Sequence, residues 1–162
     1  MTLIRKATRE DLEQLWNRSI ADHPGEECYY RWKRQFIADN ESGAAATFAV
    51  ICDGEPVGEG TLLFSPACKA IQGRLCLADG VNVTNINALR IRKEYEGRGY
   101  VSQLVRTMED YARSQGYSQI TIGVEAVETR NLGIYLHWGY DEFLMSEGED
   151  PELVLYYGKD LT

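Results

Sequence analysis

Residues 95–102, Tyr95-Glu96-Gly97-Arg98-Gly99-Tyr100-Val101-Ser102, are the most informative stretch of this sequence. It follows a strand-like apolar run, Ile86-Asn87-Ala88-Leu89-Arg90-Ile91, and it precedes a segment with helical periodicity. Glycines at a strand-to-helix junction allow a tight turn that leaves backbone N–H groups free. These groups and the positive end of the helix dipole suit a phosphate group. The stretch therefore predicts a ligand that carries phosphate.

The segment after the glycine turn has the clearest helical pattern in the chain. Gly116 is the expected end of this helix. Its apolar stripe consists of Val101, Leu104, Val105, Met108, Tyr111 and Ala112. An alternating strand is predicted at Ile120–Val124, followed by a short helix over Leu132–Trp138. Two more strands are predicted at Tyr140–Leu144 and Leu153–Tyr157.

The first half of the chain predicts a strand, two helices and a hairpin. After a strand at Leu3 and Ile4, Thr8-Arg9-Glu10-Asp11 is typical of a capping box. A second helix is expected over Glu26–Ala38. Asp53-Gly54 indicates a tight turn between strands at 47–51 and 57–63. Residues 65–83 form a long loop, or a loop that carries a brief strand or helix.

Composition narrows the class of protein. The 162 residues are 44% hydrophobic and 26% charged, which predicts a single soluble domain over 1–162. No apolar run is long enough to span a membrane, and the N-terminus has no apolar leader, so we expect a cytoplasmic protein. Its cysteines, which we expect to be reduced and without metal, are Cys28, Cys52, Cys68 and Cys76.

The net charge of the chain indicates which classes of partner are favoured. A formal net charge of -8 disfavours nucleic acid, because phosphate backbones require a basic face. The same charge suits a cationic small molecule such as an amine, although it also serves solubility alone. We expect a small-molecule partner, neither nucleic acid nor membrane, and consider a homodimer among the assemblies.

Taken together, three motifs resemble those of the GNAT-type N-acetyltransferase superfamily. They are the opening Ile4–Leu12, the stretch Leu89–Gly99, and Tyr135-Leu136-His137-Trp138-Gly139-Tyr140. The resemblance covers nearly the whole chain. It implies an α+β fold with a splayed, mostly antiparallel mixed sheet of about six to seven strands and about four helices. It also implies acetyl-CoA as co-substrate, with no metal.

The resemblance assigns two segments to acetyl-CoA. Strand residues Leu89, Arg90 and Ile91 would pair with the pantetheine arm, and a backbone N–H there would polarise the thioester carbonyl. Backbone N–H groups of the turn would hold the pyrophosphate, with the Ser102 hydroxyl as an extra donor. The turn residues are Glu96, Gly97, Arg98, Gly99, Tyr100, Val101 and Ser102. Glu96 and Val101 depart from the family pattern, which has Arg or Gln and Gly or Ala there.

Tyr135 matches the family tyrosine and is our candidate general acid. A thiol has a pKa of roughly 8.5 and a phenol of roughly 10, so a phenol can protonate a departing thiolate at little cost. An acceptor ammonium must also lose a proton. Candidate bases are Glu59, Asp79 and Glu125. Glu125 is preferred because the end of its strand should face the cleft where that strand splays from its neighbour. Water is the alternative base.

By resemblance, the acceptor pocket lies around residues 23–32, where aromatic and acidic side chains would suit an amine. An ordinary amphipathic helix explains the same pattern. The predicted function is direct acetyl transfer from acetyl-CoA to a primary amine of a small cationic molecule. The alternative is a non-catalytic acyl-CoA-binding or regulatory module, which Glu96 and Val101 favour. An unrelated nucleotide-binding protein that uses the glycine turn for phosphate is a weaker alternative, because the sequence lacks the GxxxxGK[ST] motif.

Overall fold

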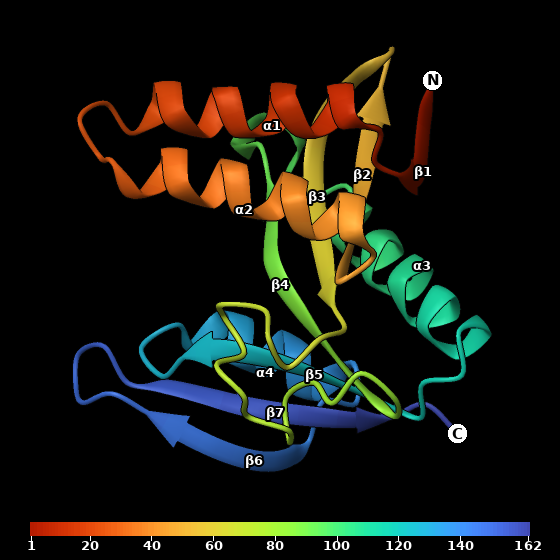
Figure 1. The fold of residues 1–162 in the computed structure, drawn as a ribbon, viewed down its shortest axis with the longest axis vertical. Coiled ribbons are helices and arrows are strands. Elements are labelled where there is room, and N and C mark those ends of the chain that lie inside the picture. Colours follow the sequence, from red (N-terminus) through yellow and green to blue (C-terminus); the bar gives the residue numbers. More distant parts are fainter. The chain divides into compact units, whose positions relative to one another are not determined.

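The computed structural model describes residues 1–162 and has an α+β architecture with seven strands and four α-helices (Figure 1). A short 3-10 turn, η1, covers Lys93–Tyr95. The elements are β1 (Thr2–Lys6), α1 (Arg9–Asp22), α2 (Cys28–Ser42), β2 (Ala45–Cys52), β3 (Glu55–Leu63), β4 (Val83–Ile91), α3 (Tyr100–Ser114), β5 (Gln119–Glu125), α4 (Thr129–His137), β6 (Glu142–Glu147) and β7 (Val154–Asp160).

The strands form one mostly antiparallel open sheet in the order β1-β2-β3-β4-β5-β7-β6. Strands β4 and β5 run parallel, whereas β1–β2, β5–β7 and β6–β7 are antiparallel. The predicted fold class, with its strand and helix numbers, is confirmed. No helix is long and apolar enough to cross a membrane.

Internal contacts divide the chain into two compact units. The first contains residues 1–62 and 88–108, and the second contains residues 63–87 and 109–162. Strand β4 and helix α3 each contribute residues to both. That residues 1–162 form one domain stays a prediction.

In the first unit, α1 and α2 lie side by side, and α2 packs on β2 (Figure 1). The predicted capping box is present: the Thr8 hydroxyl accepts from the Asp11 N–H at 3.1 Å, and the Asp11 carboxylate accepts from the Thr8 N–H at 2.9 Å. Helix α2 begins two residues later than predicted and continues to Ser42, where Gly43 ends it at φ 84°.

The predicted hairpin of β2 and β3 is also confirmed. Asp53 and Gly54 both have positive φ, 50° and 81°, as the tightest hairpin turn requires. Both strands are buried almost throughout. The hairpin therefore forms the centre of the first unit.

Strand β4 is interrupted at Ala88. Its parallel pairing with β5 runs from Val83 to Ile86, and Ala88 then adopts the left-handed region at φ 53°. A residue with a Cβ rarely takes this conformation, which costs about 1–2 kcal/mol. The part of β4 that belongs to the first unit therefore starts at a strained residue.

The second unit contains β5, β6, β7, α4 and the loop at 64–82, which has turns and bends but no strand or α-helix. The loop is tied down at Asp79, whose carboxylate accepts from the N–H groups of Val81, Asn82 and Val83. Strand β6 starts at Glu142 rather than at the predicted Tyr140, because Tyr140 is fully buried and its hydroxyl bonds elsewhere.

Candidate functional site

The glycine turn joins β4 to α3 within the first unit. Gly97 and Gly99 have φ of 75° and 80°, where residues with a Cβ are strained. A Cβ on Gly97 would meet nothing within 4 Å, and one on Gly99 would meet only the Gln103 side chain at 3.8 Å. These glycines are therefore required for the backbone conformation and not for lack of space.

The turn leaves a run of backbone donors without partners. The first hydrogen bond into α3 runs from the Gln103 N–H to the Gly99 carbonyl at 3.1 Å. None of the N–H groups from Gly97 to Ser102 donates a hydrogen bond within the protein. Unpaired N–H groups at a helix N-terminus form a favourable site for an anion.

One predicted donor does not belong to this set. The N–H of Glu96 donates to the Lys93 carbonyl at 3.1 Å and so closes the 3-10 turn η1. The donors of the candidate site therefore begin at Gly97, and the prediction that they begin at Glu96 is wrong in this detail.

The charged side chains of the turn point to solvent or to other partners. Glu96 is exposed and pairs with neither neighbouring arginine. Arg92 instead binds Glu55 at 2.9 Å, and the Arg98 guanidinium lies 5.4 Å from the centre of the Tyr95 ring. The Ser102 hydroxyl accepts a hydrogen bond from Arg106 at 2.8 Å, so its own proton is still available to a ligand.

The two faces of β3 and β4 carry different groups. A Cβ placed on Gly60 would lie 3.0 Å from Leu89 and 2.8 Å from Met108, so α3 covers that face. On the opposite face, Arg90 binds Glu59 at 2.9 Å. Leu89 and Arg90 therefore lie on opposite faces of β4.

Tyr135 lies in the second unit, on α4. Its ring is half-buried with the Trp138 ring 5.9 Å away, and its hydroxyl makes no hydrogen bond within the protein. Burial, and next the charge of Glu128, raise the pKa of Tyr135 above its usual value. The hydroxyl therefore keeps its proton at neutral pH and has no competing acceptor.

Two other tyrosines of this unit have structural partners. The Tyr140 hydroxyl donates to Glu109 at 2.7 Å, and burial, followed by the charge of Glu109, raises the pKa of Tyr140 strongly. Lys159 also donates to Glu109, at 3.0 Å. Sequence reasoning missed Glu109, because on the sequence it is one polar position at the edge of an apolar stripe.

The three candidate bases differ in their surroundings. Glu125 is exposed at the end of β5. Burial alone would raise the pKa of Asp79, but the three backbone hydrogen bonds that its carboxylate accepts together lower it, so this carboxylate stabilises the loop. Burial raises the pKa of Glu59 even though Arg90 acts in the opposite direction. No cluster of His, Cys, Asp or Glu residues has an arrangement that could hold a metal ion.

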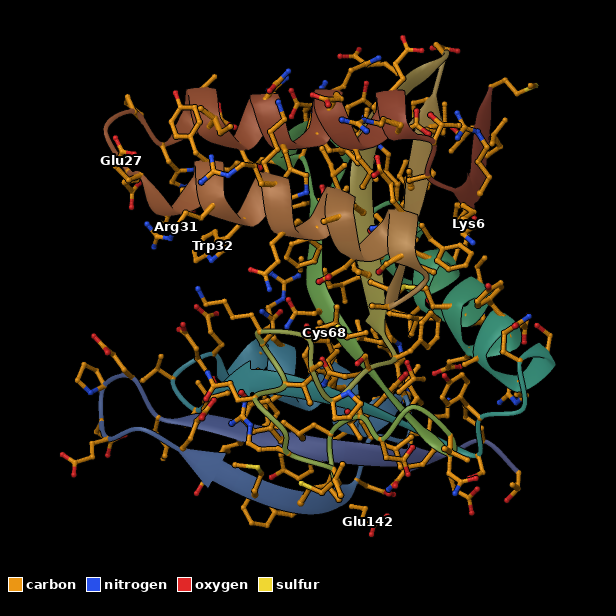
Figure 2. All side chains as sticks on the ribbon, viewed as in Figure 1. Lys6, Glu27, Arg31, Trp32, Cys68 and Glu142 are labelled. Atoms are coloured by element: carbon orange, nitrogen blue, oxygen red, sulfur yellow. The ribbon has the colours of Figure 1, made fainter.

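The region around residues 23–32 carries stacked aromatic rings. His23 stacks on Tyr29 with 4.1 Å between ring centres, and Trp32 meets Tyr29 edge-on at 4.9 Å. Trp32 extends from α2 on the side away from α1 (Figure 2) and is 40% exposed. On the same helix Phe36 is buried, whereas Tyr29 and Trp32 are not.

Solved structures share this fold at low sequence identity. An N-acetyltransferase from Staphylococcus aureus Mu50 aligns with a TM-score of 0.71 and 17% identity, covering 100% of this chain and 99% of that one. An aminoglycoside 6'-acetyltransferase type Ii aligns with a TM-score of 0.75 and 15% identity, covering 99% of this chain and 97% of that one. A PaiA N-acetyltransferase from Thermoplasma acidophilum, solved in complex with coenzyme A, aligns with a TM-score of 0.65 and 19% identity, covering 99% of each chain.

Sequence comparison adds a local match and a family match. Human N-acetyltransferase 8B is 33% identical over 52 residues, which cover 32% of this chain and only 23% of that protein. The sequence profile of the Acetyltransferase (GNAT) family matches residues 6–140, which include all three motifs except the first two residues of the opening one. The chain belongs to the GNAT acetyltransferase family.

Proposed function

We propose that this protein transfers an acetyl group directly from acetyl-CoA to a primary amine of a small cationic molecule. The observation that carries the proposal is the run of unpaired N–H groups from Gly97 to Ser102, at the junction of β4 and α3. The family match and the neighbour bound to coenzyme A support the same ligand. The turn fits a pyrophosphate because backbone donors hold it whatever the side chains are.

The strand before the turn supplies the second part of the proposal. We infer that backbone groups of Leu89, Arg90 and Ile91 bind the pantetheine arm and that one N–H polarises the thioester carbonyl. Ala88 supports this role, because its left-handed φ of 53° turns the chain out of regular pairing just before these residues. A preorganised backbone donor at a carbonyl that gains negative charge is worth about 3–4 kcal/mol in catalysis.

Tyr135 is the proposed general acid and Glu125 the proposed general base. The amine nitrogen forms a bond to the acetyl carbon, the C–S bond breaks, and the sulfur leaves as a thiolate. The Tyr135 hydroxyl gives its proton to that sulfur, because its raised pKa keeps it protonated and it has no other acceptor. Glu125, exposed at the end of β5, takes one proton of the ammonium group before the attack, directly or through water. The second proton, which the nitrogen loses as the amide forms, passes through water and restores the Tyr135 hydroxyl.

The direct test is a transfer assay. The protein would be mixed with acetyl-CoA and a panel of primary amines, and products would be identified by mass, with free thiol measured in parallel. Acetylated amine formed together with one equivalent of CoA supports the proposal. Binding of acetyl-CoA with no transfer to any amine favours the non-catalytic module.

A further inference from the structure

The side chain of Arg90 lies in a charged and aromatic group that the proposed chemistry does not use. This group, the Arg90 cluster, consists of Trp16 on α1, Glu59 on β3 and Arg90 on β4. The Arg90 Nη2 donates to the Glu59 Oε1 at 2.9 Å, and its guanidinium carbon lies 4.6 Å from the centre of the Trp16 ring. All three residues belong to the first unit.

The contribution of the cluster to the stability of the fold does not explain why these residues are present. The Glu59 side chain is only 3% exposed, on a strand that is otherwise almost entirely buried. Replacing such an ion pair with apolar residues is often neutral or stabilising. Trp16 is 2% exposed, and its indole N–H has no hydrogen-bond partner, a cost of about 1–3 kcal/mol that phenylalanine would avoid. A role in fixing Arg90 accounts for both residues.

Arg90 is held in place but keeps free donors. Glu59 binds one end of the guanidinium and the Trp16 ring packs against it, yet the side chain remains 35% exposed. It makes one hydrogen bond within the protein, although a guanidinium carries five N–H donors and keeps its charge at any physiological pH. A preorganised guanidinium with an open edge matches the two oxygens of a carboxylate.

A group of aromatic side chains lies at the α1–α2 connection of the same unit. The Tyr29 ring contacts those of His23 and Trp32, and neither Tyr29 nor Trp32 is fully buried. Burial and then the charge of Glu26 raise the pKa of Tyr29, whereas the charge of Arg90 lowers it in part. These rings offer flat apolar surfaces to the body of a molecule whose oxyanion binds Arg90.

We propose that Arg90 recognises a carboxylate on the acceptor, so that the acceptor is an amino acid-like molecule with an apolar or aromatic body. This inference rests on the proposed transfer of acetyl from acetyl-CoA to a primary amine, and it replaces the small cationic acceptor of that proposal with a zwitterionic one. Such an acceptor carries an ammonium group for acetylation and a carboxylate for Arg90. Because its two charges cancel, the chain's net charge of -8 does not repel it.

The test compares molecules that differ only in the carboxylate. L-phenylalanine and phenethylamine, and L-tryptophan and tryptamine, would be titrated calorimetrically into the protein with and without CoA. The wild type should bind each amino acid at least about tenfold more tightly than its amine, the effect of a charge-assisted hydrogen-bond pair. Equal affinity for the two members of each pair, or no binding of either amino acid, would overturn the proposal.

Paired variants separate recognition from structure. Glu59→Gln should strengthen amino acid binding, because it removes the competing carboxylate from Arg90. The double variant Glu59→Gln/Arg90→Gln, which leaves no buried charge unpaired, should lose about ten- to a hundredfold in amino acid affinity and little in amine affinity. Equal losses for both members of each pair would show a purely structural role.

A control ion pair lies two residues farther along the chain, just after the end of β4. Glu55→Gln/Arg92→Gln removes this more exposed ion pair between β3 and the 3-10 turn, and it should leave both affinities unchanged. Failure of the proposed function would appear separately, as absence of CoA binding. The titrations without CoA would still decide whether Arg90 binds a carboxylate.

Discussion

At the scale of single residues, one hydroxyl group distinguishes the proposed acid from its neighbours. The hydroxyl of Tyr140 donates to Glu109 and that of Tyr156 donates to Glu147, whereas that of Tyr135 has no acceptor in the protein. Only a hydroxyl with a free proton can serve a departing thiolate. The sequence identifies Tyr135 by motif, and the hydrogen bonds give the physical reason for choosing it.

Tyr135→Phe should lower kcat about a hundredfold while the Kd for acetyl-CoA stays near that of the wild type, since general acids contribute about 10²–10⁴. Steady-state kinetics and calorimetry would measure the two quantities. Tyr140→Phe is the control and should lower the melting temperature without a specific loss of kcat. An unchanged kcat in Tyr135→Phe would remove this residue as the acid.

Asp11 makes stability depend on pH. Burial alone would raise the pKa of Asp11, but hydrogen bonds from Arg5 and Thr8 and the charge of Arg5 lower it below its usual range. A carboxyl with a lowered folded pKa stabilises the protein above its unfolded pKa of about 3.9, and this stabilisation is lost as the pH falls through the folded pKa.

Asp11→Asn should therefore lower the free energy of unfolding at pH 7 by about 1–3 kcal/mol, and the difference from the wild type should shrink below about pH 4. Urea unfolding at several pH values measures this. Asp110→Asn, which alters a carboxylate 80% exposed beside Arg113, should have little effect. A difference for Asp11→Asn that stays constant into acid would refute the assignment.

At the scale of elements, local patterns predict structure well and long-range contacts decide the rest. The Thr8–Asp11 capping box and the Asp53-Gly54 turn involve neighbouring residues, so the sequence predicts both correctly. The start of β6 depends on Tyr140 reaching Glu109 on α3, 31 positions away. No local pattern reveals that contact.

Two glycine substitutions, one in the turn between β4 and α3 and one in the β2–β3 hairpin, test whether the conformation of the turn controls acetyl-CoA binding. Gly99→Ala strains a residue at φ 80° by about 1–2 kcal/mol and turns its neighbours' N–H groups away from the ligand. We expect the Kd for acetyl-CoA to rise about tenfold or more. Gly54→Ala imposes similar strain at φ 81° in the β2–β3 turn.

Gly54→Ala should thus lower stability to a comparable degree with acetyl-CoA affinity unchanged. Thermal unfolding and calorimetry on both variants would separate the two effects. Parallel losses of affinity would mean that general destabilisation, and not the turn, controls binding.

Ala88 provides a second element-scale prediction, at the interruption of β4. Ala88→Gly should raise the melting temperature, because it relieves a left-handed φ, whereas Ala88→Val should lower it, because a β-branched side chain tolerates that region least. Differential scanning calorimetry measures both. The same direction of change in the two variants would contradict strain at this residue.

At the scale of the whole molecule, the order of motifs is sufficient to predict the fold class but not the site in full. The mostly antiparallel mixed sheet, its seven strands and the four helices agree with the expectation from the resemblance. The sequence does not predict those parts of the site in which residues far apart in the chain pair with each other. Glu59 and Arg90 are 31 positions apart, and the sequence offered several possible partners for each. Similarly, only the structure shows that the Glu96 N–H closes η1.

In the proposed function, the turn from Gly97 to Ser102 binds acetyl-CoA. Calorimetric titration of the purified protein with acetyl-CoA, with CoA, ATP and NAD as comparisons, tests it most directly. We expect micromolar binding of acetyl-CoA and CoA, and none of ATP or NAD at the same concentrations. Absence of binding by acetyl-CoA, or equal binding of all four compounds, would contradict the claim.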